Sequence, residues 1–142
     1  MEPIASASDV MPTPTLPSVT PLTQPFWDAA ARGRLLLPRC HACRRHFFRP
    51  EVACTHCFAT DWAWTEASGH GSLYSYSILH KAPAPGFPVP LVLAVVELDE
   101  GPFMFSNLVR CAHAEIRIGM RLQVQFDRVG AGIHLPRFKP QS

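Results

Sequence analysis

The chain has 142 residues, a length that fits one domain or two very small modules and excludes a large multidomain enzyme. Its 13 Lys and Arg residues barely outnumber its 11 Asp and Glu residues, so the formal net charge is +2. This balance excludes a histone-like protein that binds nucleic acid by phosphate neutralisation alone, and any anion site must be local.

The first 24 residues are proline-rich and contain no Lys or Arg. They lack the basic and apolar regions of a secretory signal, and they cannot bury enough apolar surface to offset chain entropy. We therefore expect residues 1–24 to be a disordered linker. No PxxP sequence there has basic flanks, which argues against a ligand for an adaptor domain. Because no apolar stretch reaches about 18 residues, we expect a soluble, cytoplasmic protein without a membrane span.

Residues 25–34 are predicted to form a short N-terminal helix. Pro25 suits a first helical turn, the alanines that follow favour helix, and Gly33 favours a stop. A helix this short is marginal alone, so Phe26 and Trp27 must pack on something. They could pack on the protein's own body or on a partner surface, and we keep the two aromatics as candidate interface residues.

Residues 35–66 carry a metal-binding pattern, together with short segments typical of small strands (LLLPRC, FFRP and DWAWTE). Cys40-x-x-Cys43 is followed, ten residues later, by Cys54-x-x-Cys57. Two such turns aim four thiolates at one ion and complete the tetrahedron that zinc accepts. This closed shell leaves no position for water or substrate, so we expect a structural zinc ribbon. Iron in a rubredoxin-like site and a metal-free ribbon are the alternatives.

The residues around the cysteines add two observations. Glycine often follows the second cysteine of such a turn because the turn favours a left-handed residue, but Arg44 and Phe58 stand there. We therefore expect strained or slightly altered turns. Three histidines are near enough in sequence to compete as ligands, but four cysteines already satisfy the ion (His41, His46 and His56).

Residues 67–142 show the period-two pattern of a β-structure. Five segments are strand candidates, at 70–81, 90–98, 103–110, 121–129 and 133–138. Only the connection between the third and fourth has room for a helical turn. Five short strands with a helical element after the third match the OB-fold barrel, and a small sandwich is the alternative.

Residues 25–140 resemble the acyl-CoA-associated zinc-ribbon/OB-fold family, formerly a domain of unknown function. The resemblance rests on PFWDAAARGRLLLPRCHAC, CTHC, SGHGSLYSYSILHKAPAPGF, VPLVLAVVELDEGPFMFSNLV and IRIGMRLQVQF. It implies a rubredoxin-like ribbon followed by an OB-fold, in agreement with the patterns above. It also implies a non-catalytic accessory subunit that binds acyl-CoA and assembles with a thiolase-like or lipid-transfer-protein-like enzyme. The departures are Arg44 in place of glycine and the long proline-rich tail.

The charge distribution permits acyl-CoA binding. Residues 28–51 and residues 110–139 each carry a net charge of +4, whereas residues 52–109 carry −4. We take Lys81 and Arg110 as candidate ligands of the CoA phosphates.

A stiff, proline-rich loop spans residues 82–90, with Phe87 near its tip. It suits a partner surface or a pantetheine channel, and covering the mouth of its own barrel is equally plausible. We keep Phe87 as a candidate ligand-binding residue.

Single-stranded nucleic-acid binding is the alternative function, since zinc ribbons and OB-folds both serve it. Four strand aromatics could stack bases (Tyr74, Tyr76, Phe103 and Phe105). However, alternating apolar residues are typical of a barrel core, and the low net charge argues against nucleic acid. A basic stripe along the sheet would favour nucleic acid, whereas an apolar channel ending in one basic cluster would favour CoA.

Independent catalysis has little support in the sequence. There is no GxSxG, no Walker loop, no paired acid and base and no open metal site. Cys111 has no sequence partner, and we expect a partly buried hydrophobe rather than a nucleophile. The chemistry is therefore expected to belong to the partner enzyme.

Overall fold

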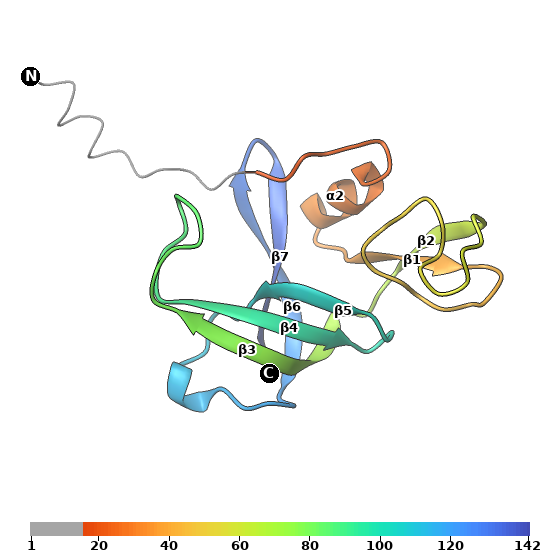
Figure 1. The fold of residues 1–142 in the computed structure, drawn as a ribbon. Coiled ribbons are helices and arrows are strands. Elements are labelled where there is room, and N and C mark those ends of the chain that lie inside the picture. Colours follow the sequence, from red (N-terminus) through yellow and green to blue (C-terminus); the bar gives the residue numbers. More distant parts are fainter. Residues whose placement is uncertain (1–15) are drawn as a thin grey trace, which may run out of the picture.

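The computed structural model describes residues 16–142, and residues 1–15 of the proline-rich segment lie outside the described part. In the described part, the helix α2 precedes a two-stranded ribbon and a five-stranded barrel (Figure 1). The elements in chain order are α2 (Gln24–Ala31), β1 (Leu36–Cys40), β2 (Trp62–Glu66), β3 (His70–Leu79), β4 (Leu91–Leu98), β5 (Phe103–Asn107), the 3₁₀-helix η1 (His113–Glu115), β6 (Arg121–Gly130) and β7 (Ile133–Pro140). The predicted fold class, mainly β with a short helix, a ribbon and an OB-fold, is confirmed.

Helix α2 begins one residue before Pro25 and ends earlier than the pattern indicates. After Ala31 the chain turns, and Gly33 has a φ of +76° that suits glycine. The buried face consists of Phe26, Ala29 and Ala30, spaced to lie on one side of the helix. Just before the helix, residues 20–23 form a hydrogen-bonded turn within the segment that composition assigns to the linker.

The ribbon is built on the antiparallel pair β1–β2, which runs from Leu36 opposite Glu66 to Cys40 opposite Trp62. The FFRP segment forms no third strand among the described residues, and only an isolated bridge joins Arg39 to His46. A small core of Cys40, Phe47 and Cys54 lies between the turns.

The barrel sheet has the strand order β5-β4-β3-β6-β7, with antiparallel pairing throughout. A parallel bridge between Leu108 and Phe138 brings β5 and β7 together. The buried hydroxyl of Ser106 donates to the Pro136 carbonyl at 2.8 Å, which satisfies it inside the barrel. Two such links between the outer strands close the sheet on itself.

One main core fills the barrel and extends to the base of the ribbon. Fully buried side chains of the barrel include Leu73, Val96 and Phe138, and the same cluster contains Phe26 of α2 and Leu37 of β1. The helix and the start of the ribbon are therefore anchored to the barrel by apolar packing. Within residues 16–142 no helix is long and apolar enough to cross a membrane.

The strand aromatics expected in the barrel core are instead exposed. Phe103 and Phe105 lie opposite Glu97 and Val95 on the outer face of the sheet, while Met104 and Ser106 point inward. The side chains of β5 do alternate between the two faces of the sheet, but its two large aromatic residues lie on the outer face. Tyr74 occupies a β-bulge in β3, where its ring meets Phe103 at a centroid distance of 4.8 Å. Tyr76 is also exposed.

Candidate functional site

Two backbone turns of the same shape present the four cysteines. The N–H of Cys40 donates to the Arg45 carbonyl at 2.9 Å, and the N–H of Cys54 donates to the Ala59 carbonyl at 2.8 Å. In each turn the residue after the second cysteine is left-handed, because Arg44 and Phe58 both have a φ of 65°. The expected left-handed position is thus present, occupied by residues with full side chains.

The four cysteine sulfurs lie within 4.8 Å of one another. The Sγ atoms of Cys40 and Cys57 are 3.6 Å apart, and those of Cys43 and Cys54 are 3.7 Å apart. A tetrahedron with metal–sulfur bonds of ~2.3 Å has edges of about 3.8 Å, so this set fits one four-coordinate ion. The N–H of Cys43, directed at the Cys40 sulfur, lowers the pKa of Cys40 to about 7 and favours its thiolate. In its neighbour Cys57 the Ala59 N–H acts in the same direction, but the Cys40 side chain and burial outweigh it and raise the pKa to about 11.

The other candidate ligands around this centre make contacts of their own. The His41 ring lies 3.0 Å from a carboxylate oxygen of Asp61, and the His56 ring nitrogen lies 3.2 Å from the His46 carbonyl oxygen.

The fifth cysteine, Cys111, lies far along the chain and is half-buried. Burial and, to a lesser degree, the charge of Glu115 raise its pKa. A thiol with a raised pKa is a poor nucleophile.

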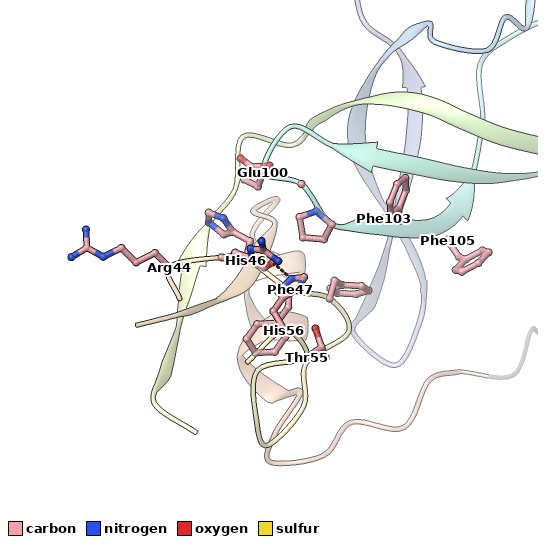
Figure 2. A pocket seen from close by; sticks show the side chains of 12 residues that line it. Arg44, His46, Phe47, Thr55, His56, Glu100, Phe103 and Phe105 are labelled. Atoms are coloured by element: carbon pink, nitrogen blue, oxygen red, sulfur yellow. Dashed lines mark hydrogen bonds between the residues drawn. The ribbon is translucent and has the colours of Figure 1, made fainter. Parts of the chain in front are cut away.

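A trough of about 690 Å³ runs along the junction between ribbon and barrel (Figure 2). His46, Phe47 and His56 lie on its ribbon side, whereas Glu100 and Phe103 lie on its barrel side. The lining also includes the following further residues: Arg44, Arg45, Phe48, Thr55, Gly101, Pro102 and Phe105. Figure 2 shows the cationic Arg44 at one end of the trough and the aromatic Phe105 at the other.

A second cavity of about 390 Å³ shares Phe48 and Phe105 with the trough. Its lining is mostly apolar and comes from α2, the proline-rich loop, β4, β5 and β7: Phe26, Trp27, Pro83, Phe87, Leu91, Leu93, Met104, Ser106, Asn107, Leu135 and Pro136. A third cavity, of about 330 Å³, shares Arg44 with the other end of the trough and is also lined by Arg39. Arginines thus gather at one end and apolar side chains at the other.

The structure brings some candidate residues into this system and leaves others outside it. Trp27 and Phe87 line the apolar cavity, while Lys81 and Arg110 line none of the three cavities. Phe26 is only 6% exposed and packs in the main core, so it offers little surface to a partner. This agrees with the alternative that Phe26 packs on the protein's own body, since a short helix is marginal without such packing, and a role of Phe26 in a partner interface stays a prediction.

Sequence reasoning did not assign four of the lining residues to this site, although it named Arg44 in a cysteine turn and Phe105 as a base-stacking candidate (Arg44, Arg45, Phe48 and Phe105). The Arg44–Arg45 pair directly after a cysteine turn is a visible signal, since that turn fixes its place beside the metal centre. Phe48 and Phe105 are 57 positions apart in the sequence. No local pattern joins two such distant residues.

Comparison with family models matches two consecutive segments of this chain. Residues 27–63 match the model described as "ChsH2, rubredoxin-like zinc ribbon domain", and residues 64–127 match "ChsH2, C-terminal OB-fold domain". The four cysteines lie within the first segment and most of the barrel lies within the second.

Among curated relatives, a "Probable enoyl-CoA hydratase alpha subunit" of Thermomonospora curvata is 40% identical over 116 residues, which is 81% of this chain. The match spans only 36% of that relative's length. A "DUF35 domain-containing scaffold protein" of Methanothermobacter thermautotrophicus is 32% identical, and the match covers 69% of this chain and 75% of the relative.

Among solved structures, one described as "Ltp2-ChsH2(DUF35) aldolase" contains a chain that matches with a TM-score of 0.79 and 37% identity. The match covers 88% of this chain and 98% of that chain. The likeness therefore includes ribbon, junction and barrel together.

Proposed function

Because this chain belongs to the ChsH2/DUF35 family of zinc-ribbon and OB-fold proteins, we propose that it is a non-catalytic accessory subunit of a thiolase-superfamily enzyme and helps that enzyme hold its acyl-CoA substrate. One observation carries the proposal. The matching chain of the Ltp2-ChsH2(DUF35) aldolase is covered over 98% of its length at 37% identity. Likeness over the whole of a chain that occurs in such an assembly favours the same kind of assembly here.

The metal in this proposal is a structural zinc ion held by Cys40, Cys43, Cys54 and Cys57. Their sulfur spacing fits four-coordinate zinc, and the match to a rubredoxin-like zinc ribbon supports that choice over other metals. When bound, zinc would cross-link two turns whose own core contains few side chains. Because four thiolates complete its coordination, the ion would leave catalysis to the partner enzyme.

The cavities support acyl-CoA as the ligand. A CoA thioester has a polyanionic nucleotide at one end and an uncharged arm at the other. The trough and the cavities beside it offer arginines at one end and an apolar compartment at the other. The chemistry of the ligand requires an apolar channel that ends in one basic cluster, and this arrangement of side chains supports acyl-CoA as the ligand.

The same structure disfavours nucleic-acid binding, although exposed aromatics on the sheet could stack bases. Strands β3, β4 and β5 contain no Lys or Arg, and β4 carries Glu97 beside the exposed Phe103. A groove that follows a phosphate backbone needs cations along its length.

The partner surface is proposed at the open side of the apolar cavity, where Trp27 and Phe87 lie. Trp27 is half-buried and packs edge-to-face on Phe26 at 5.0 Å, so the core fixes its position. A fixed aromatic at a cavity rim is a common interface anchor.

Co-expression tests the proposal directly. The tagged chain is expressed with each thiolase-superfamily enzyme of its own organism, and complexes are separated by size exclusion. We expect a stable hetero-oligomer with at least one of them, and we expect Trp27→Ala to weaken it by ~2 kcal/mol. Assembly with none of these enzymes, or with a hydratase alone, would contradict the proposed partner.

A further inference from the structure

We infer that acyl-CoA lies along one continuous path across the ribbon–barrel junction, with its phosphates at the arginine end of the trough and its thioester arm passing between Phe48 and Phe105. This inference rests on the proposed function and adds the direction of the ligand and the residues that set it. Two shared linings carry it: Arg44 joins the trough to the basic cavity, and the two phenylalanines join it to the apolar cavity.

The arginine end is a cluster of available cations. Arg39, Arg44 and Arg45 line the trough or the cavity beside it, and Arg39 Nε donates to the Arg44 carbonyl at 3.1 Å. Within residues 16–142 none of the three forms an ion pair, whereas three other arginines do (Arg34, Arg121 and Arg137). Guanidinium groups without carboxylate partners are free to bind phosphate oxygens.

Charged and neutral side chains in the middle of the trough decide which end of it an anionic group can occupy. Glu100 accepts the Ser68 N–H at 2.8 Å through one carboxylate oxygen, and its other oxygen is buried without a partner among the described residues. His46 lies on the opposite wall, where burial, together with the charge of Arg39, lowers its pKa and favours the neutral ring. The Glu100 carboxylate therefore repels phosphates from the middle of the trough, and the neutral His46 ring does not offset that repulsion. Phosphates are expected to bind at the arginine end instead.

The trough meets the apolar cavity at a point that we call the neck, where Phe48 and Phe105 line both. Phe105 is 75% exposed on the outer face of β5, so a large apolar ring faces water there. Its ring borders both cavities, so an apolar arm passing the neck would cover it. Beyond the neck the lining is mostly apolar, which suits the acyl end and excludes the phosphates.

Calorimetry on the full chain, alone and in complex with the partner enzyme, tests the path with two probes. Adenosine 3′,5′-bisphosphate reports on the arginine end, and decanoyl-CoA reports on the whole path. We expect the double variant Arg44→Ala/Arg45→Ala to weaken both probes about tenfold or more, with a smaller salt dependence. We expect Phe105→Ala to weaken decanoyl-CoA about tenfold and to leave the bisphosphate unchanged.

Matched controls are Arg128→Ala, which removes an exposed arginine of β6, and Ile118→Ala, which removes an apolar side chain that is 63% exposed. Both should bind like the parent, and retained metal content shows that the variants keep their fold. If the parent binds acyl-CoA but the double variant binds the bisphosphate equally well, or Phe105→Ala weakens both probes alike, the path is wrong and the proposed function stands. If neither the chain nor its complex binds acyl-CoA, the proposed function itself is wrong.

Discussion

Arg44 and Phe58 occupy positions where glycine would cost less. Both have a φ of 65°, a conformation in which the Cβ atom is crowded and which costs a residue other than glycine about 1 kcal/mol. The cysteine turns keep this geometry because backbone hydrogen bonds close each of them, from Cys40 to Arg45 and from Cys54 to Ala59. At Arg44 this strained backbone conformation accompanies a guanidinium group at the end of the trough.

At Phe58 the same strain predicts a stabilising substitution. The ring is 79% exposed, so Phe58→Gly loses little burial and removes the crowding. We expect the free energy of unfolding to rise by about 1 kcal/mol, measured by urea denaturation of the zinc-loaded protein. Val52 is 74% exposed on the same ribbon and is not left-handed, so Val52→Gly should lower stability slightly. Equal effects of the two substitutions would show that the turn stores no strain.

Among the elements, β3 meets β4 on one side and β6 on the other at Gly71, which pairs with Leu98 and with Leu122. A Cβ atom on Gly71 would lie 2.6 Å from the Glu97 carbonyl oxygen and 2.8 Å from a methyl group of Val96. The backbone oxygen belongs to the ladder and cannot move aside. Glycine is therefore required here by space rather than by its own backbone conformation.

We expect Gly71→Ala to lower the free energy of unfolding by about 2 kcal/mol or more, because the new methyl group separates strands in the centre of the sheet. Ser77→Ala is the control, since Ser77 lies on the same strand with an exposed side chain. Chemical denaturation compares the two. A change within about 0.5 kcal/mol for Gly71→Ala would mean that the sheet tolerates the shift.

A surface ion pair also ties β6 to the end of β4. Arg121 donates to both carboxylate oxygens of Asp99, at 2.9 and 2.7 Å, and this hydrogen bonding holds the pKa of Asp99 below its ordinary value. The contribution is complete above about pH 5, where an unfolded aspartate is almost fully ionised, and is lost as the pH falls through the lowered value. Asp99→Asn should therefore be less stable than the parent at pH 6, and the difference should shrink as the pH falls below the lowered pKa of Asp99. A pH-independent difference in melting temperature would contradict this origin.

Local sequence pattern predicts the elements well, because period-two alternation and turn residues depend on neighbours along the chain. All five barrel strands and the helical turn after the third lie where the pattern places them. The pattern cannot tell which phase of β5 faces inward, since that phase is fixed by distant contacts such as burial of Met104 in the main core and the hydrogen bond from Ser106 to Pro136, 30 residues away. The trough and its neck escape local analysis for the same reason, as their walls come from ribbon and barrel together.

At the scale of the molecule, two apolar clusters of unequal size hold residues 16–142 together. The main core joins α2, the start of β1 and the barrel, while the outer ribbon has only Cys40, Phe47 and Cys54 with a few half-buried neighbours. A cluster of that size cannot offset the entropy of ordering both turns, so the metal must supply the difference. Of the residues between the cysteines, Phe48 packs against the edge of the main core as a half-buried side chain, so the barrel core depends little on the segment that the metal orders.

Metal removal should therefore unfold the outer ribbon and leave the barrel folded. After chelation we expect amide protons of residues 40–59 to exchange at least about tenfold faster, while those of β4 keep their protection. Trp62 gives a second readout, because its ring packs on Phe47 at 5.5 Å and becomes exposed when that contact is lost. Trp62→Phe should reduce the fluorescence change without abolishing it, since Trp64 packs on Phe26 in the main core but also on the ring at position 62, at 5.3 Å. Loss of protection throughout the chain would instead show that ribbon and barrel unfold as one cooperative unit.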